Sequence, residues 1–306
     1  MQQYRDTNYA AVSAALHARE AHLLTQALSE RMLEAPTAEE SCKLLIECGY
    51  PPIEHCTLGE VEHLLALSRA ELYREVAVLA PDKRLVELFQ LKYDYHNAKL
   101  ALKAKLTGED VSRLVIGCGR YDAAALLRGE RGMLSSRMGR AMAQAEKEAE
   151  GGDVRAAELT LDRACFEEMS ELAGATGNEF LIGYVALQID AINLRTLVRA
   201  QRMGASDELL SAALLPGGHI PANQLKTARG DRLAELTRGS ALSAAGELAA
   251  SLTSGSLTAF ERACDDALMQ YLQRARRTPF GPEVIVGYLS AKEAEFTAVR
   301  TILSGK

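Results

Sequence analysis

Apolar residues recur every three to four positions along most of the chain, which is the spacing of one face of an α-helix. The pattern predicts long helices over 6–34, 81–106, 133–149, 153–173, 178–203, 256–277 and 282–303. No segment shows the convincing alternation of apolar and polar residues that is typical of a half-buried strand. The sequence therefore predicts an all-α fold.

Several helix starts are marked by a Ser or Thr with a Glu three positions later. In such a capping box the hydroxyl accepts a backbone hydrogen bond and the acid reaches back toward the start of the helix. The pairs are Thr37/Glu40, Thr57/Glu60, Ser68/Glu71, Thr176/Glu179 and Thr258/Glu261. We expect a helix to begin after each of these hydroxyl residues.

A polar motif recurs at intervals of about 100 residues. We call its copies the polar rows. The first is Asp94, Asn97 and Lys99; the second is Asp190, Asn193 and Arg195; the third keeps the acid and the base as Glu295 and Arg300 but has Ala298 in place of the Asn. The recurrence predicts a threefold internal repeat.

Two further segments support the repeat. The motif Asp162-Arg-Ala-Cys165 returns as Glu261-Arg-Ala-Cys264, and a glycine turn at 117–119 returns at 217–218. The predicted units are 1–110, 111–210 and 211–306. We expect the N-terminal segment of the first unit to pack against the C-terminal unit.

The polar rows allow two interpretations. Asp94 and Asn97 lie one turn apart on a helix, whereas Lys99 is rotated by about 140° from Asp94. In one interpretation the acids and bases tie each helix to its neighbours within its own unit. In the other, three equivalent rows converge on a shared axis or surface and form a socket.

Composition narrows the class of protein. The chain has 306 residues, of which 48% are apolar and 25% charged, so it can bury a sizeable core. A formal net charge of −6 argues against a general nucleic-acid binder, which needs a basic face. The start of the chain shows no basic stretch that leads into an apolar run, so we expect no secretory leader, and no run of about 18 uncharged apolar residues occurs. We expect a cytoplasmic chain without a membrane span.

The six cysteines form no C-x-x-C pair, and we expect them to be reduced and buried. Cys48, His55, Cys56 and His63 are the best metal candidates. Their spacing fits no zinc module, and the capping box at Thr57 accounts for the local pattern. We therefore expect no metal.

No motif for catalysis or nucleotide binding stands out. Gly117-x-Gly119-x-x-Asp122 resembles part of a dinucleotide fingerprint, but that site needs a preceding strand and a third glycine. His96 beside Asp94, or His17 with Glu20 and His22, has no accompanying nucleophile or oxyanion motif. We expect no catalytic residue and no cofactor.

One basic stretch could face a partner. The stretch 128–140 contains Arg128, Arg131, Arg137 and Arg140, and its one acidic residue is Glu130. An acidic protein or lipid surface would be the partner that this stretch could bind.

Five segments resemble the C subunit of V-type and A-type rotary ATPases and ATP synthases, which is similar to the d subunit of the eukaryotic vacuolar enzyme. They are Tyr9–Leu24 with Arg19 and Glu20, Ala35–Tyr50, Asp94–Lys99, Leu215–Pro221 and Pro279–Lys306. The turn at 117–120 departs from the family pattern, as does Ala298, where relatives often carry Asn.

The resemblance implies a non-catalytic subunit with three similar helical domains in a funnel around a pseudo-threefold axis. Its partners would be the central shaft, made of the D and F subunits, and the proteolipid rotor ring. The chain would lie at the cytoplasmic face of the membrane, held there through the ring. ATP-linked proton or sodium transport would then depend on it as a mechanical coupler.

Ten residues are the candidates for partner binding. They are Asp94, Asn97, Lys99, Asp190, Asn193, Arg195, Glu283, Lys292, Glu295 and Arg300. Two other classes stay open, namely a free-standing helical repeat scaffold with other partners, and a helical enzyme or metal protein.

Overall fold

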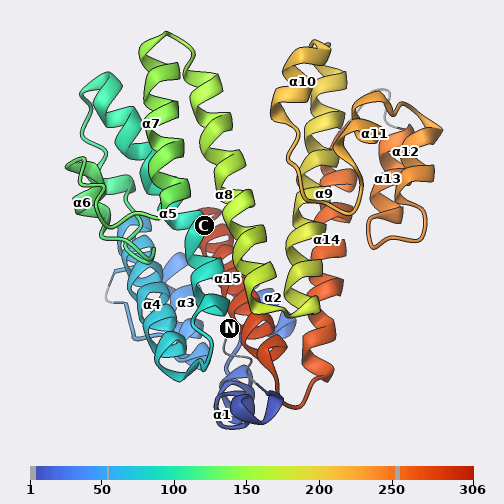
Figure 1. Ribbon diagram of the computed structural model, residues 1–306. Helices are drawn as coiled ribbons and strands as arrows, with labels where there is room; N and C mark the ends of the chain where they lie inside the picture. The colour runs from blue at the N-terminus through green and yellow to red at the C-terminus, as the bar shows by residue number, and fades with distance from the viewer. Residues whose placement is uncertain (1–4, 54, 252–255) are drawn as a thin grey trace. The chain divides into compact units, whose positions relative to one another are not determined.

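The computed structural model describes residues 5–53, 55–251 and 256–306. Every regular element within these ranges is a helix, and none is a strand, which confirms the all-α prediction (Figure 1). Contacts between Cα atoms group the chain into two compact units. The first unit consists of residues 1–93, 116–120 and 275–306, and the second of residues 94–115 and 121–274.

The first unit is built around the C-terminal helix α15 (Pro282–Ser304). Helices α1 (Ala10–Glu20), α2 (Gln26–Glu34), α3 (Ala38–Leu44) and α4 (Leu58–Leu79) all pack against it. Because α15 is contacted from several sides, it buries apolar residues around most of its circumference, among them Val284, Val286 and Phe296. The N-terminal segment thus packs on the last helix of the chain.

Helix α5 (Arg84–Thr107) belongs to both units, since residues up to Tyr93 group with the first and residues from Asp94 with the second. The longer helices of the second unit are α7 (Ser136–Glu150), α8 (Val154–Thr176), α9 (Glu179–Arg202) and α14 (Thr258–Gln273). Its shorter ones are α6 (Ala123–Leu127), α10 (Asp207–Ala213), α11 (Ala222–Thr227), α12 (Asp231–Thr237) and α13 (Ser243–Ser251).

The core of the second unit is centred on α9. Helices α8, α10, α11 and α14 pack against it, and Leu194 and Leu197 are fully buried there. Small residues let helices approach closely, as where α13 meets α12. A Cβ on Gly246 would lie 1.8 Å from Thr237 Oγ1, so this contact requires glycine.

Short 3-10 helices complete the described part of the chain. They are η1 (Asp6–Tyr9), η2 (Leu45–Cys48), η3 (Ser112–Leu114) and η4 (Arg274–Arg277).

The predicted helix bounds agree closely with the structure for α5, α7, α8, α9 and α15. The stretch predicted as one helix over 6–34 is instead divided into η1, α1 and α2. The division occurs at Thr25, whose hydroxyl accepts a hydrogen bond from the amide of Leu28 at 3.2 Å. This cap starts a new helix at Gln26.

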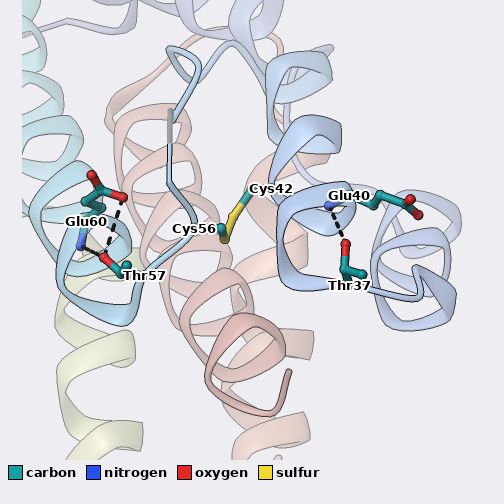
Figure 2. Close-up of a disulfide and its surroundings, with 6 residues drawn as sticks. All are labelled: Thr37, Glu40, Cys42, Cys56, Thr57 and Glu60. Atoms are coloured by element: carbon teal, nitrogen blue, oxygen red, sulfur yellow. Dashed lines mark hydrogen bonds between the residues drawn. A yellow bond between two sulfur atoms is a disulfide. The ribbon is translucent and has the colours of Figure 1, made fainter.

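Two predicted helix starts are confirmed. Thr37 caps α3 and Thr57 caps α4, each accepting from the amide three residues on, those of Glu40 and Glu60, at 3.2 Å (Figure 2).

The other three predicted starts are wrong in detail. Ser68 lies inside α4, because the helix that begins at Leu58 continues through it. Thr176 is the last residue of α8, and Asn178 caps α9. Thr258 is the first residue of α14, which follows Leu257 without a side-chain cap.

The expectation that all cysteines are reduced is wrong for two of them. Cys42 on α3 and Cys56, just before α4, form a disulfide with a Cα–Cα distance of 6.4 Å (Figure 2). The return of the chain from α3 to α4 brings the two sulfurs together, which their spacing in sequence does not reveal. Cys48, Cys118, Cys165 and Cys264 are free and buried, as expected.

Helix α9 is the one helix in the described residues that is long and apolar enough to cross a membrane. However, 61% of its most apolar window is buried inside the protein, as is typical of a core helix. Its apolar character is therefore used in packing.

Candidate functional site

The three polar rows lie on three long helices. The first row is on α5, the second on α9 and the third on α15. The acids of all three rows are almost fully buried: Asp94 is 0% exposed, Asp190 2% and Glu295 4%. A buried carboxylate needs hydrogen-bond donors to compensate for lost water, so the donors show what each acid does.

Asp190 anchors the turn between α10 and α11. Its carboxylate oxygens accept hydrogen bonds from the backbone amides of His219 and Ile220, each at 3.0 Å. His219 Nδ1 also lies 3.1 Å from the Asp190 carboxylate. Burial raises the pKa of Asp190 above its ordinary value, while the backbone bonds from Ile220 and His219 act in the opposite direction. The carboxylate therefore fixes the backbone of this turn.

The other two acids accept the same kind of bond. The amide of Tyr121 donates to Asp94 at 3.3 Å, and the amide of Leu24 donates to Glu295 at 2.8 Å. In every copy a donor amide comes directly before the N-cap residue of a helix. The donors Leu24, Tyr121 and Ile220 precede the N-caps Thr25 of α2, Asp122 of α6 and Pro221 of α11.

The bases of the first two rows also have equivalent partners. Lys99 Nζ lies 2.6 Å from Asp162 on α8, and Arg195 Nε lies 2.7 Å from Glu261 on α14. Asp162 and Glu261 are the first residues of the recurring Asp/Glu-Arg-Ala-Cys motif, so both ends of the pair repeat. In the third copy Arg300 on α15 pairs with Glu62 on α4.

In the third copy of the motif, the C-terminal helix α15 therefore pairs with N-terminal segments of the chain. Helix α15, at the C-terminus, takes the place in the N-terminal copy that α5 and α9 take in the other two. These contacts support the interpretation that acid and base tie each row helix to the other helices of its own copy. The division of the chain at 1–110, 111–210 and 211–306 stays a prediction.

The asparagines are buried with the acids. Asn193 donates to the carbonyl of Leu215 at 2.8 Å and accepts from the Leu215 amide at 2.7 Å. Asn97 is likewise fully buried on α5. Asn193 thus fixes the segment that leads into the turn held by Asp190.

Lys292 and Glu295 meet on α15. Lys292 Nζ lies 2.5 Å from Glu295 and over the rings of Tyr50 and Phe296, at 4.9 and 5.3 Å from their centroids. The Tyr50 hydroxyl donates to Glu295 at 2.6 Å. Glu283 lies in the first turn of α15 and is partly exposed. The remaining candidates of the rows other than Asn97 make the separate contacts described above.

A second polar cluster in the first unit was missed by the sequence reasoning. Glu293 on α15 accepts hydrogen bonds from the hydroxyls of Tyr73 at 2.7 Å and Tyr93 at 2.5 Å. Lys92 Nζ lies 3.0 Å from its carboxylate, and Arg69 Nε lies 3.7 Å from it. Arg69 belongs to Ser68-Arg-Ala70, a faint counterpart of the Asp162 motif. This likeness was the signal in the sequence that could have pointed to Arg69.

The cluster holds Glu293 ionised. Burial alone would raise the pKa of its carboxyl, but the charge of Lys92 and the bonds from Tyr93 and Tyr73 outweigh burial and lower it. The pKa values of both tyrosines are raised, chiefly by burial and by the neighbouring charge of Glu293.

Cys56 of the metal candidate and the glycine turn of the nucleotide candidate have structural roles. Cys56 is in the disulfide, and no group of three or more His, Cys, Asp or Glu residues in the described ranges could hold a metal. Gln90 of α5 donates to the carbonyls of Cys118 at 3.0 Å and Gly119 at 3.3 Å. Helix α5 therefore holds the glycine turn at 117–119.

The candidate acid–base groups make local contacts. His17 lies 2.9 Å from Glu20, which raises the pKa of the imidazole through a hydrogen bond. His96 lies 3.1 Å from the carbonyl oxygen of Leu114.

Three of the four arginines in the basic stretch pair within the chain. Arg128 lies 2.7 Å from Glu130, Arg131 pairs with Glu146, and Arg137 pairs with Glu167 and Glu171 on α8. Internal pairing lowers the charge that this stretch offers to an acidic partner.

The chain is similar to known proteins over nearly its whole length. The ATP synthase (C/AC39) subunit family matches residues 12–306. The C subunit of the V-type sodium ATPase of Enterococcus hirae is 23% identical over 97% of this chain and 94% of its own length. The C subunit of the V-type ATP synthase of Thermus thermophilus is 26% identical over 96% of this chain and 92% of its own length.

An archaeal relative is similar over the same extent. The C subunit of the A-type ATP synthase of Methanocaldococcus jannaschii is 26% identical over 97% of this chain and 82% of its own length. The family match covers all three polar rows, as well as Leu24, Tyr121 and Ile220, whose amides bond to their acids. The chain therefore belongs to the ATP synthase (C/AC39) subunit family.

Proposed function

We propose that this chain is the non-catalytic subunit of a V/A-type rotary ATPase or ATP synthase that couples the central shaft, made of the D and F subunits, to the proteolipid rotor ring. The observation that carries the proposal is the full-length match to C subunits of V-type and A-type enzymes. On this proposal the chain performs no chemical step. It acts at the cytoplasmic face of the membrane, held there through the ring, and ATP-linked proton or sodium transport depends on its stiffness.

The internal ties suit such a coupler. A part that transmits torque must resist shear between its helices, and close-packed helices have low compressibility. The carboxylates of Asp94, Asp190 and Glu295 each bind a backbone amide of another segment. The same tie occurs in all three copies, which is consistent with three similar units around a pseudo-threefold axis.

The ten candidate residues would contribute in two ways. The buried acids and Asn193 would act by fixing the helices that carry them. Lys99 and Arg300 keep 33% and 64% of their side-chain surface exposed, so they can also contact a partner directly. Basic groups on a repeated scaffold would give broad polar contacts, which suit a joint between assemblies of different symmetry.

The proposal is tested by recovering the tagged chain from mild detergent extracts. We expect it to be recovered with the proteolipid and with the D and F subunits. Recovery with unrelated partners and without these subunits would favour a free-standing repeat scaffold and contradict the proposal.

A charge swap separates a tie from a partner contact. Lys99→Asp should lower both the melting temperature and the capture of the D and F subunits. Adding Asp162→Lys should restore the internal pair and the melting temperature, while capture stays weak if Lys99 also contacts the shaft. Restoration of both would contradict a direct contact by Lys99. Arg262→Asp with Asp266→Lys, an exposed pair within α14 whose atoms lie 3.8 Å apart, is the matched control.

A further inference from the structure

The disulfide between Cys42 and Cys56 links the two ends of a segment of the first unit that contacts α15. Between the two cysteines the chain forms η2 and then turns at Gly49, whose φ of +80° is a left-handed conformation that favours glycine. After the turn comes Tyr50, 5% exposed, whose hydroxyl donates to Glu295 at 2.6 Å. The disulfide thus bounds the segment that supplies a donor to the third polar row.

The same segment forms a wall of a cavity. Cys48, Gly49, Tyr50 and Pro51 are among the residues that line a pocket of about 350 Å³, together with Tyr288 and Lys292 of α15. Release of the segment would open this wall and uncover the pair of Lys292 with Glu295. The segment that the disulfide bounds therefore covers part of a buried ion pair.

On its other side the disulfide positions the start of α4. Cys56 comes directly before Thr57, whose hydroxyl caps this helix (Figure 2). Cys42 lies on α3, which packs on α2 and on α15. One covalent bond thus joins the start of α4 to α3.

The two sulfurs are not equally accessible. Cys42 is 6% exposed, whereas Cys56 is partly exposed and lies in a segment whose neighbours His55 and Thr57 are exposed. A thiolate from outside would therefore reach Cys56 Sγ first. Thiol–disulfide exchange requires such access as well as a thiolate nucleophile.

The free thiols do not compete for this bond. Burial raises the pKa of Cys48 and Cys264 to about 11 and of Cys118 and Cys165 to about 12. At neutral pH they are protonated, and a protonated thiol is a poor nucleophile.

We propose that Cys42–Cys56 is a thiol–disulfide exchange site that responds to a protein dithiol of the C-x-x-C class. This inference is independent of the proposed coupling function. One thiolate of the dithiol attacks Cys56 Sγ, the Sγ–Sγ bond breaks, and its electron pair goes to Cys42 Sγ, which takes up a proton. The second thiol of the dithiol attacks the mixed disulfide and releases Cys56. The chain gains two electrons and two protons, and the dithiol leaves as a disulfide.

The test uses the full chain equilibrated with mixtures of reduced and oxidised dithiothreitol, a small dithiol that probes the exchange directly. We expect digestion without reductant to yield a linked Cys42–Cys56 peptide in oxidising mixtures. Reducing mixtures should free both thiols, and trapping during reduction should find the mixed disulfide on Cys56. Absence of the linked peptide in every mixture, or trapping on Cys42 instead, would overturn the proposal.

Hydrogen exchange shows whether the bond controls its segment. The Tyr50 amide, which bonds to the carbonyl of Leu45, and the amides of 45–49 and Ile53 should exchange roughly tenfold faster after reduction, because the segment opens locally. Cys264→Ser should retain this response and Cys42→Ser should show fast exchange in every mixture. Equal exchange in oxidised and reduced protein would contradict a controlling role. Because this comparison uses the wild-type chain in both states, it does not depend on whether a variant folds.

Discussion

The carboxylate of Glu295 accepts a hydrogen bond from the backbone amide of Leu24 at 2.8 Å, although 271 positions separate the two residues in sequence. This bond joins the last helix of the chain to the entry of α2. It occupies the position that the bonds of Asp94 to Tyr121 and of Asp190 to Ile220 occupy in the other copies. The N-terminal copy is therefore completed by the C-terminal helix.

Loss of the Glu295 carboxylate should destabilise the first unit strongly. Glu295→Ala removes the acceptor for Leu24 and Tyr50 and leaves the ammonium of Lys292 without its carboxylate. We expect the free energy of unfolding to fall by about 3 kcal/mol, the cost typical of breaking a buried ion pair. Tyr50→Phe removes one donor and should cost about 1 kcal/mol. Urea unfolding measures both, and equal small losses in the two variants would contradict the assignment.

Two glycines should respond in opposite directions to the same substitution. A Cβ on Gly218 would lie 2.1 Å from Asp190 Oδ1, so Gly218→Ala should displace the anchored turn and cost about 2 kcal/mol or more. Gly174 lies within α8 with nothing within 4 Å of an added Cβ. Gly174→Ala should therefore stabilise the chain by about 0.5 to 1 kcal/mol. Thermal unfolding of the two variants provides the comparison, and a stable Gly218→Ala would rule out the close approach to Asp190.

The equivalent ion pairs should have coupling energies of the same sign but different size. A double-mutant cycle on Lys99 and Asp162 should give about 0.5 to 1 kcal/mol, because both side chains are partly exposed. The cycle on Arg195 and Glu261 should give a larger value, about 1 to 2 kcal/mol, since Arg195 has only 17% of its side-chain surface exposed. A coupling energy near zero for both pairs would show that these contacts do not tie the helices.

Two buried carboxyls should give opposite pH dependence. The pKa of Glu293 is lower in the folded chain than its ordinary value of 4.5, so its ionisation stabilises the fold at neutral pH. The stability advantage of wild type over Glu293→Gln should therefore shrink as the pH falls below about 4.5.

Asp190 has a raised pKa, so its contribution has the opposite sign. Relative to Asp190→Asn, wild type should gain stability as the pH falls through the folded pKa toward 3.8. Chemical denaturation between pH 3 and pH 7 measures both trends. The same slope for the two variants would contradict one of the two assigned environments.

The periodicity of apolar residues was sufficient for the long helices α5, α7, α8, α9 and α15, but α4 is not among the long helices that it predicted, and the helix predicted over 6–34 is divided. The bounds of α8, α9 and α15 follow from it because a helix that buries one face must place apolar residues at a fixed spacing. Short helices and helix starts were predicted less well. Thr176 and Ser68 satisfy the capping pattern, but the first ends α8 and the second lies within α4, because the packing of these long helices overrides a local signal.

The recurring polar positions were recognised in the sequence, but their contacts were not. Recurrence marked Asp94, Asp190 and Glu295 as equivalent positions. It did not show that each is buried and bound to a backbone amide. Glu293 was missed because it does not recur, and its partners Arg69, Tyr73 and Tyr93 come from α4 and α5.

By itself the sequence determined the helical class, most of the long helices and the threefold recurrence of acid and base, because these depend on spacings along the chain. Only the tertiary structure decided which groups meet. The bond from Leu24 to Glu295 and the disulfide of Cys42 with Cys56 join segments whose approach is set by helix packing. That approach results from many apolar contacts acting together, and no local pattern of residues encodes it.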